Sequence, residues 1–471
     1  MTNSPSTHAT FDRRTAIARI AAGTCAGAAT LVTASCSRNP DASARTVRLW
    51  TLALSPRFDD YMRTHVAAFE QGHPGVRVEW TDVAYDALDR KLIAAAAAGM
   101  APDVVNMADL NYARFVALGA FRDIRADLPG DPDTTYLPGA LSLCTIGGKL
   151  LALPWYVNPQ TRIINAALLA RGNFDPLKLP PDWSGLMQLA PTFRRLTQNY
   201  LFSQPLGEES QLPIMMLAEG LAPLRAREGG RLAANLSSEP VASYLGQWVE
   251  LYRSGALPRE AATKGHAHLL DLYQDGRVAI ISTGPNFLNR IRDVSPKVYA
   301  TTTVQPGAVG ALGRVHMPVM VLAVSSQTSV PREAAELAWF MTSAPAQTSL
   351  CKLAPIMPSS TASLQDPFFA NIASREPDKT LALGTSVALR TLPQAVAFTA
   401  SLDTWPNLRR SFEDEFKRVL LDGADLRTSL GRIDKAWNEL LDAAPPAGLD
   451  CVPRPSRVEP PAAFVGVGGA A

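Results

Sequence analysis

The sequence predicts an α/β fold with two lobes, and three observations carry this prediction. Stretches with strand-like alternation take turns with helix-like stretches along most of the chain, which is typical of a largely parallel sheet covered by helices on both faces. An apolar run that ends at residue 36 has the layout of an export signal. The remainder of the 471-residue chain is long for one domain, which favours two lobes.

The first part of the chain reads as strands and helices in turn. In residues 46–52 the side chains alternate, with Val47, Leu49 and Thr51 on one face of a strand. A helix follows from about Phe58, because apolar residues then recur at helical spacing. Further strands are expected at 76–83 and 102–107, and further helices at 85–100 and 113–124.

The second part of the chain continues this alternation. Residues 149–165 predict two strands joined by a segment with aromatic residues. Residues 317–325 predict a buried strand. Residues 275–293 predict a strand that runs through a Gly-Pro turn into a helix. Residues 331–350 predict one long amphipathic helix that begins at Pro331. Further helices are expected at 180–196, 212–224, 243–257, 404–423 and 426–443.

Residues 1–36 resemble a bacterial lipoprotein signal, in which Cys36 becomes the lipid-modified first residue. Arg13 and Arg14 give a positive start, and the uncharged stretch that follows is too weakly apolar for a membrane-spanning helix. Thr33 stands where the lipoprotein pattern usually has Leu. The arginine pair also resembles a twin-arginine signal, so export by the Sec or the twin-arginine route remains open.

Composition indicates how the two ends of the chain behave and which classes of partner to expect. Residues 37–45 read as a flexible tether, and the Pro-, Gly- and Ala-rich residues 445–471 predict a disordered tail. The formal net charge is +2 and no basic cluster occurs, so no nucleic-acid partner is expected. Cys144, Cys351 and Cys451 are widely spaced, which predicts buried free thiols more than a disulfide framework.

The chain carries none of the common enzyme motifs, such as GxSxG, HExxH, a P-loop or paired CxxC. His266 and His268 form an HxH pair, but no third metal ligand lies nearby in sequence. We therefore expect no enzymatic activity, no cofactor and no metal.

Polar residues at strand ends are the first candidates for a ligand site. In open α/β sheets, ligands bind beyond the carboxyl ends of the strands. This rule selects Trp50 and Thr51 at the end of the first strand, and Asp109 and Asn111 after the third.

Six stretches, in order, resemble the extracellular solute-binding proteins of ABC importers, in the group that binds sugars and oligosaccharides. "PPDWSGLMQL" is similar to the family's P-x-T-W-x-E-L helix start, although Asp182 and Gly185 depart from it. "YQDGRVAIISTGPNF" is similar to F-x-x-G-x-A-A-M-x-x-x-G, and "PREAAELAWFMTSAPAQ" to A-W-x-F-x-x-F-L-T-S-P-E-A-Q. The others are residues 46–80, 91–107 and 151–175, and the resemblance extends from residue 46 to about 443.

The resemblance implies a periplasmic-binding-protein-like fold, in which hinge strands join two α/β lobes and the ligand lies between them. Lobe 1 would comprise residues 46–157 plus about 304–345, and lobe 2 residues 158–303 plus about 346–444. The lobes would close on the ligand, and membrane permease subunits would sense this closure. The protein would be a periplasmic or cell-surface, membrane-anchored lipoprotein, and we expect a monomer.

The resemblance also adds site residues, because a sugar needs aromatic platforms and side chains that both donate and accept hydrogen bonds. The crossing "PWYVN" supplies Trp155, Tyr156 and Asn158, and "GPNF" supplies Asn286 and Phe287. Asn286 stands where the family usually has Trp. Gln211 and Trp405 complete the set of ligand-binding candidates.

Several alternatives stay open. The same fold could bind a glycerol phosphate through Arg162 or Arg409, or a polyamine through Asp109 and Glu208. The protein could also be a sensor or adaptor without transport, or a lipid-anchored carbohydrate-active enzyme. We prefer a neutral sugar because the expected rim mixes aromatic and amide side chains.

Overall fold

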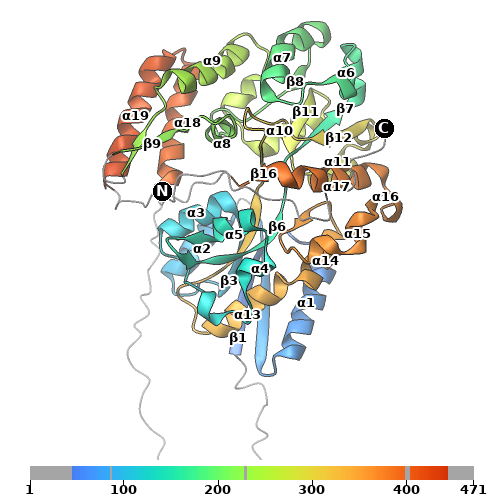
Figure 1. The fold of residues 1–471 in the computed structure, drawn as a ribbon, viewed down its shortest axis with the longest axis vertical. Helices are drawn as coiled ribbons and strands as arrows, with labels where there is room; N and C mark the ends of the chain where they lie inside the picture. The colour runs from blue at the N-terminus through green and yellow to red at the C-terminus, as the bar shows by residue number, and fades with distance from the viewer. Residues whose placement is uncertain (1–44, 85–86, 228–230, 398–403, 444–471) are drawn as a thin grey trace, which may run out of the picture. The chain divides into compact units, whose positions relative to one another are not determined.

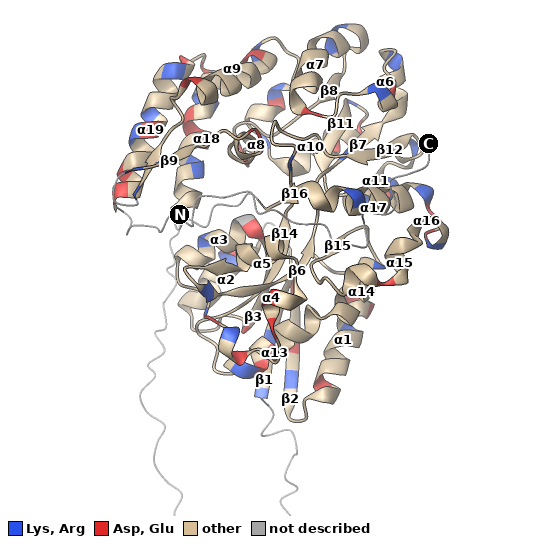
Figure 2. Ribbon diagram, in the orientation of Figure 1, with Lys and Arg blue, Asp and Glu red and all other residues tan. Residues whose placement is uncertain are grey.

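The computed structural model describes residues 45–84, 87–227, 231–397 and 404–443 (Figure 1). The expected signal with Cys36, nearly all of the expected tether at 37–45, and the expected tail at 445–471 lie outside these residues. In the described ranges, Lys and Arg are interspersed with Asp and Glu along most elements (Figure 2).

The first sheet has six strands in the order β15-β6-β14-β3-β1-β2. Strand β1, next to the edge strand β2, is parallel to both β2 and β3, whereas β14 is antiparallel to β3 and β6. Val47, Leu49 and Thr51 are buried, so the predicted alternation of the first strand is confirmed. The strands are β1 (Arg45–Leu52), β2 (Val76–Val83), β3 (Val104–Ala108), β6 (Ala152–Val157), β14 (Val319–Val324) and β15 (Met357–Pro358).

Helices cover this sheet and bury a first hydrophobic core with it (Figure 1). They are α1 (Asp59–Gly72), α2 (Leu88–Ala97), α3 (Asp109–Ala117), α4 (Pro132–Thr135), α5 (Pro138–Cys144), α13 (Pro331–Met341), α14 (Ala344–Cys351) and α15 (Pro367–Ala370). Cys144 and Cys351 are buried free thiols in this core, as predicted. Burial raises the pKa of both thiols, which keeps them protonated at neutral pH.

The second sheet has four strands in the order β12-β7-β11-β8. The strands are β12 (Thr302–Pro306), β7 (Thr161–Asn165), β11 (Val278–Thr283) and β8 (Tyr200–Phe202). Strand β11 is parallel to β8 and antiparallel to β7. Ile164 and Ile280 enter one hydrophobic cluster, and their neighbours Ile163 and Ile281 enter another. Because successive side chains point to opposite faces, both faces of this sheet are covered.

The helices around the second sheet are α6 (Ala166–Arg171), α7 (Trp183–Thr197), α8 (Leu212–Ala218), α9 (Glu239–Arg253), α10 (His266–Gln274), α11 (Phe287–Val294), α12 (Pro296–Tyr299), α16 (Ile372–Arg375), α17 (Lys379–Thr391), α18 (Trp405–Leu421) and α19 (Leu426–Ala443). Small strand pairs complete the fold: β4 (Thr145–Ile146) with β5 (Lys149–Leu150), β9 (Leu224–Ala226) with β10 (Leu232–Ala234), and β13 (Val315–His316) with β16 (Ala395–Val396). In the described ranges, each helix is too short or too polar to cross a membrane.

Two helix predictions need correction. The helix expected at 113–124 begins at Asp109, directly after β3, and ends at Ala117. The helix expected at 331–350 is two helices, α13 and α14, separated at Thr342 and Ser343. Pro345 in the first turn of α14 explains this break, since proline has no backbone N–H to donate into a continuous helix.

The division into lobes stays a prediction, and the hydrophobic clusters bear on its boundary. Leu350, Met357 and Phe369 pack in the first core together with residues of the first sheet. Core packing therefore favours a first lobe that continues to about Phe369, beyond the expected boundary near residue 345.

Candidate functional site

Three loops meet at one edge of the second sheet. Strands β8 and β11 are parallel and end at this edge, and β7 begins there because Thr161 pairs with Thr283. The chain therefore places Gln204 after β8, residues 284–287 after β11, and residues 158–160 before β7 at the same edge. This is the edge at which α/β sheets bind ligands.

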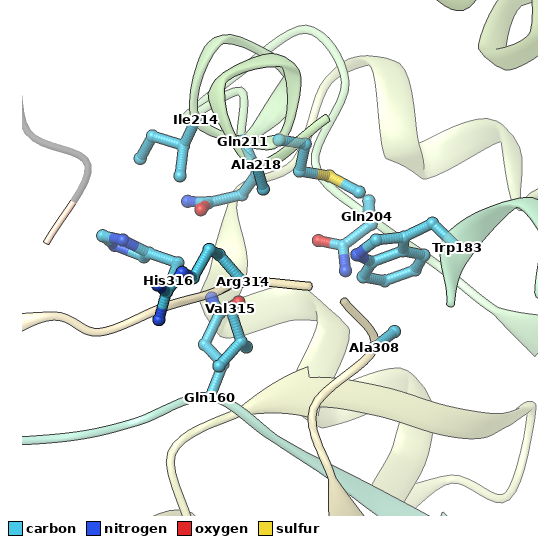
Figure 3. Close-up of a pocket in the computed structure, with 11 residues that line it drawn as sticks. Gln160, Trp183, Gln204, Gln211, Ile214, Ala218, Ala308, Arg314, Val315 and His316 are labelled. Atoms are coloured by element: carbon cyan, nitrogen blue, oxygen red, sulfur yellow. The ribbon is translucent and has the colours of Figure 1, made fainter. Parts of the chain in front are cut away.

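A hollow opens at this edge, between α8, the start of α7 and the crossing strand β13 (Figure 3). Its space is about 320 Å³ with the open mouth and the solvent in it counted. The residues that line it are Gln160, Trp183, Gln204, Gln211, Ile214, Met215, Ala218, Ala308, Arg314, Val315 and His316. Of the residues predicted to bind a ligand, Gln211 is among them.

Three glutamines from separate segments supply amide groups to the hollow (Figure 3). The backbone N–H of Gln160 donates to the carbonyl of His316 at 3.0 Å, and that of Gln211 donates to the carbonyl of Pro205 at 3.2 Å. These bonds fix the backbone, whereas the amides of Gln160, Gln204 and Gln211 have no hydrogen-bond partner among the described residues. An amide both donates and accepts, so it suits a hydroxyl group.

Trp183 forms one wall of the hollow, where the 6% of its surface that is exposed marks it as largely buried. It is the first residue of α7, and the Asp182 carboxylate caps that helix by accepting a hydrogen bond from the Gly185 N–H at 2.8 Å. Behind it lie Phe202 and Trp248, with ring centroids 5.6 and 5.9 Å away. This packing holds the indole in a fixed orientation beside the amides.

Two basic residues also line the hollow: Arg314 directly precedes β13, and His316 is the last residue of β13 (Figure 3). The Nη1 of Arg314 donates to the carbonyl of Pro393 at 3.0 Å. Burial lowers the pKa of His316 to about 4, so its imidazole is neutral at pH 7. Among the described residues that line the hollow, none is Asp or Glu.

Predicted residues Asn158, Asn286 and Phe287 come together next to Gln160. A Cβ placed on Gly284 would lie 2.5 Å from Oδ1 of Asn286 and 3.1 Å from Cβ of Asn158. The Oδ1 atoms of both asparagines are buried and have no hydrogen-bond partner among the described residues. Buried amide oxygens are seldom left unpaired, so this pair is a second place where a ligand donor could bind.

His266 supports this asparagine pair from the start of α10. Its Nε2 lies 3.0 Å from Oγ1 of Thr283, and its ring centroid is 5.5 Å from that of Phe287. Burial lowers the pKa of His266, which favours the neutral imidazole.

The predicted residues of the first sheet have structural contacts and do not line the hollow. Oγ1 of buried Thr51 donates to Oδ1 of Asp82 and accepts from Nε1 of Trp80, both at 2.7 Å. Trp50 is half-buried against the first core.

Asp109 and Asn111 lie in the first turn of α3 and not in a loop. Asp109 is buried, and Asn111 donates to Oδ1 of Asp89 at 2.8 Å.

The predicted aromatic platforms are also packed in the two cores. Trp155 on β6 is completely buried in the first core, with its centroid 5.7 Å from that of Tyr156. Trp405 at the start of α18 is 3% exposed and packs on Trp437 in the second core. Only Tyr156 of this set is half-buried.

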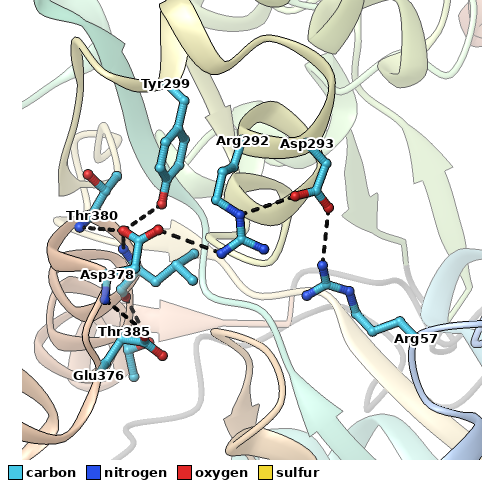
Figure 4. Close-up of polar contacts among 9 residues, drawn as sticks. Arg57, Arg292, Asp293, Tyr299, Glu376, Asp378, Thr380 and Thr385 are labelled. Atoms are coloured by element: carbon cyan, nitrogen blue, oxygen red, sulfur yellow. Dashed lines mark hydrogen bonds and ion pairs between the residues drawn. The ribbon is translucent and has the colours of Figure 1, made fainter.

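A chain of charged residues connects α11 to the first sheet (Figure 4). Asp293 near the end of α11 accepts hydrogen bonds from Arg57 at 3.3 Å and from Arg292 at 3.1 Å. Arg292 also pairs with Asp378 at 3.6 Å, and Tyr299 donates to the same carboxylate at 2.8 Å. Helix α11 thus links the asparagine pair at its start to this network at its end.

Sequence reasoning missed Gln160, Gln204, Arg314 and His316. Gln204 follows the end of β8, so the strand-end rule that points to Trp50 and Asp109 in the first sheet also points to Gln204 in the second. Trp183 packs in the second core and also forms a wall of the hollow.

Known proteins share both sequence and fold with this chain. A family model described as bacterial extracellular solute-binding protein matches residues 64–376. An uncharacterized lipoprotein in the oleD 5' region of Streptomyces antibioticus is 24% identical over 384 residues, which are 80% of this chain and 83% of that protein.

Solved structures agree with the predicted two-lobed α/β fold. A candidate oligosaccharide periplasmic-binding protein from Synechococcus sp. MITs9220 is 28% identical, with a TM-score of 0.76 over 84% of this chain and 99% of that chain. The GacH receptor of Streptomyces glaucescens, solved unliganded and with acarbose, is 18% identical, with a TM-score of 0.69 over 85% of this chain and 100% of that chain. The family match spans well over half of the sequence, and the chain belongs to the bacterial extracellular solute-binding protein family.

Proposed function

We propose that this protein captures a sugar or oligosaccharide at the carboxyl edge of the second sheet and delivers it to an ABC permease. The observation that carries the proposal is the set of three unpaired amides, from Gln160, Gln204 and Gln211, beside the indole of Trp183. Amides match the donor and acceptor pattern of hydroxyl groups, and an indole packs against the apolar face of a sugar ring. The likeness to a candidate oligosaccharide-binding protein supports the same ligand class.

Ligand capture would use lobe closure. The hollow is small for an oligosaccharide, so a longer ligand would extend from Gln204 toward the asparagine pair and the first lobe. Trp50 and Tyr156 are the half-buried candidates of the first sheet and would make this contact, whereas the buried Thr51, Trp155 and Trp405 would act through packing. A ligand that touches both lobes favours the closed state by its differential affinity.

Binding without chemistry fits the composition of the site. A glycosidase needs two carboxylates on either side of the scissile bond, and the described residues that line the hollow include no carboxylate. The described ranges also contain no group of three or more His, Cys, Asp or Glu suited to a metal. The protein would be exported and anchored by lipid at Cys36, in keeping with the lipoprotein relative.

The test is calorimetric titration of the purified protein with mono-, di- and trisaccharides. Gln204→Ala and Gln211→Ala should each weaken binding of the preferred sugar about five- to tenfold, because each removes hydrogen bonds to hydroxyl groups. Gln188→Ala is the matched control, since Gln188 is an exposed residue on α7 outside the hollow. Equal affinity in all three variants would exclude the hollow as the binding site. Lack of binding to any saccharide would overturn the proposed function.

A further inference from the structure

One cation in the hollow lacks a carboxylate partner. Arg314 lines the hollow, and its recorded hydrogen bond goes to a neutral carbonyl, that of Pro393, at 3.0 Å. Within the described ranges, Arg314 forms no ion pair, and no lining residue is acidic. The hollow therefore has a net positive charge when His316 is neutral.

The carboxylates of neighbouring segments are engaged elsewhere. Glu219 follows α8, and its Oε2 accepts from the N–H of Ala311 at 2.8 Å. Asp182 accepts from the N–H of Gly185 at 2.8 Å and caps α7. Both carboxylates thus bind backbone N–H groups, and neither forms an ion pair with Arg314.

The two arginines first considered for an anionic ligand are also engaged. Arg162 donates to the carbonyls of Pro306 at 2.9 Å and Pro180 at 2.6 Å. Arg409 pairs with Glu413 at 3.3 Å. Among these three arginines, Arg314 is the one whose side chain lines the hollow.

We propose that the captured saccharide is acidic and that its carboxylate or phosphate binds the guanidinium of Arg314. This inference rests on the sugar-binding function proposed above and names the class of sugar. Lobe closure would remove water from Arg314, and a desolvated charge is costly unless an opposite charge compensates it. A guanidinium binds carboxylate or phosphate oxygens through two parallel hydrogen bonds, which also orients the ligand.

The remaining lining side chains suit the rest of such a ligand. Gln160, Gln204 and Gln211 would bind ring hydroxyls, and Trp183 would contact the ring. A polyamine is disfavoured because its ammonium groups would meet Arg314 without a lining carboxylate in the described part of the chain.

The test compares matched acidic and neutral sugars by calorimetry. Digalacturonate is measured against galactobiose, and glucose 6-phosphate against glucose, so the two arms separate a carboxylate from a phosphate. The acidic member of at least one pair should bind about tenfold tighter or more, as charge-assisted hydrogen bonds imply. Raising NaCl from about 50 mM to about 500 mM should weaken the acidic ligand and leave the neutral one nearly unchanged.

Variants assign the preference to one side chain. Arg314→Gln should remove most of the tenfold preference by lowering the affinity for the acidic sugar more than that for its neutral partner, and Arg314→Lys should retain part of the preference. Arg90→Gln is the control, because Arg90 is exposed on α2. An unchanged melting temperature of Arg314→Gln would show that its folding is intact.

The outcomes separate the two proposals. Neutral sugars that bind as tightly as their acidic partners would overturn the acidic class and keep the sugar-binding function. An acidic preference that survives in Arg314→Gln would overturn the role of Arg314. Failure of every saccharide to bind would overturn both proposals.

Discussion

Nη2 of Arg57 lies 3.3 Å from Oδ2 of Asp293, although 236 positions separate the two residues in the sequence. Arg57 follows the first strand of the first sheet, and Asp293 lies near the end of α11, beside the second sheet. Arg292 orients the Asp293 carboxylate through a 3.1 Å hydrogen bond. The ion pair therefore links α11, which starts next to Asn286, to the segment that follows β1.

Arg57→Ala should shift the open and closed populations with little effect on stability. Both side chains are partly exposed, and such pairs contribute about 0.2–1 kcal/mol. If the pair forms only in the closed state, its loss should weaken ligand binding about two- to fivefold. Small-angle scattering and calorimetry of the variant would measure both effects.

Arg63→Ala provides the control for Arg57→Ala. Arg63 pairs with Asp60 inside α1, so its loss should not alter lobe closure. Identical scattering profiles and affinities for the two variants would contradict a role of the Arg57–Asp293 pair in closure.

Gly284→Ala should weaken ligand binding about tenfold or more. The added Cβ would lie 2.5 Å from Oδ1 of Asn286, so this side chain would have to move away from Asn158. Gly246→Ala on α9 is the matched control, because the nearest atom there, on Leu426, lies 3.7 Å from the added Cβ. That control should raise helix stability by up to about 1 kcal/mol and leave affinity unchanged. Calorimetry that finds full affinity in Gly284→Ala would remove the asparagine pair from the site.

Local sequence patterns were sufficient for most of the fold. The alternation of Val47, Leu49 and Thr51 identified a strand because side chains on a strand repeat every two residues. The two last helices were found at 404–423 and 426–443, and the structure has them as Trp405–Leu421 and Leu426–Ala443. Such patterns depend on neighbours in sequence, so the tertiary fold need not be known.

The site could be predicted only in part, because its residues come from segments far apart in the chain. Strand β13 has two residues and β8 has three, which is too short for a recognisable alternation near Arg314 or Gln204. The strand-end rule selected Asn111, but α3 begins at once after β3 and Asn111 bonds to Asp89. Which strand ends face a ligand depends on sheet order, and the sequence does not contain that order explicitly.

Trp155→Ala should destabilise the protein before it affects the ligand. The indole is completely buried in the first core, and removal of such a side chain costs about 3–5 kcal/mol. Trp50→Ala, at a half-buried position, should cost less and serves as the comparison. Denaturant unfolding of both variants, followed by calorimetry under native conditions, separates the effects. A Trp155→Ala protein with normal stability and no sugar binding would instead support direct stacking on the ligand.

His316 should make the protein less stable as the pH falls from about 6.5 to about 4. Burial lowers the pKa of His316 to about 4 in the folded state, whereas an unfolded histidine titrates near 6.5. Between these values the unfolded chain binds a proton that the folded chain does not, so the free energy of unfolding rises with pH. One pKa unit corresponds to about 1.4 kcal/mol, and the full difference is on the order of 3 kcal/mol.

The contribution of His316 can be separated from that of carboxylates by comparison with His316→Gln. Urea unfolding at pH 7 and pH 5 should show a smaller loss of stability in the variant than in the wild type, whatever the stability of the variant at pH 7. His266→Gln should reduce the loss in the same direction, because burial also lowers the pKa of His266. Equal losses in the wild type and His316→Gln would mean that the imidazole takes up its proton in the folded hollow at an ordinary pKa. In that case Arg314 would have a second cation beside it at mildly acidic pH, and an acidic sugar should then bind more tightly at pH 5 than at pH 7.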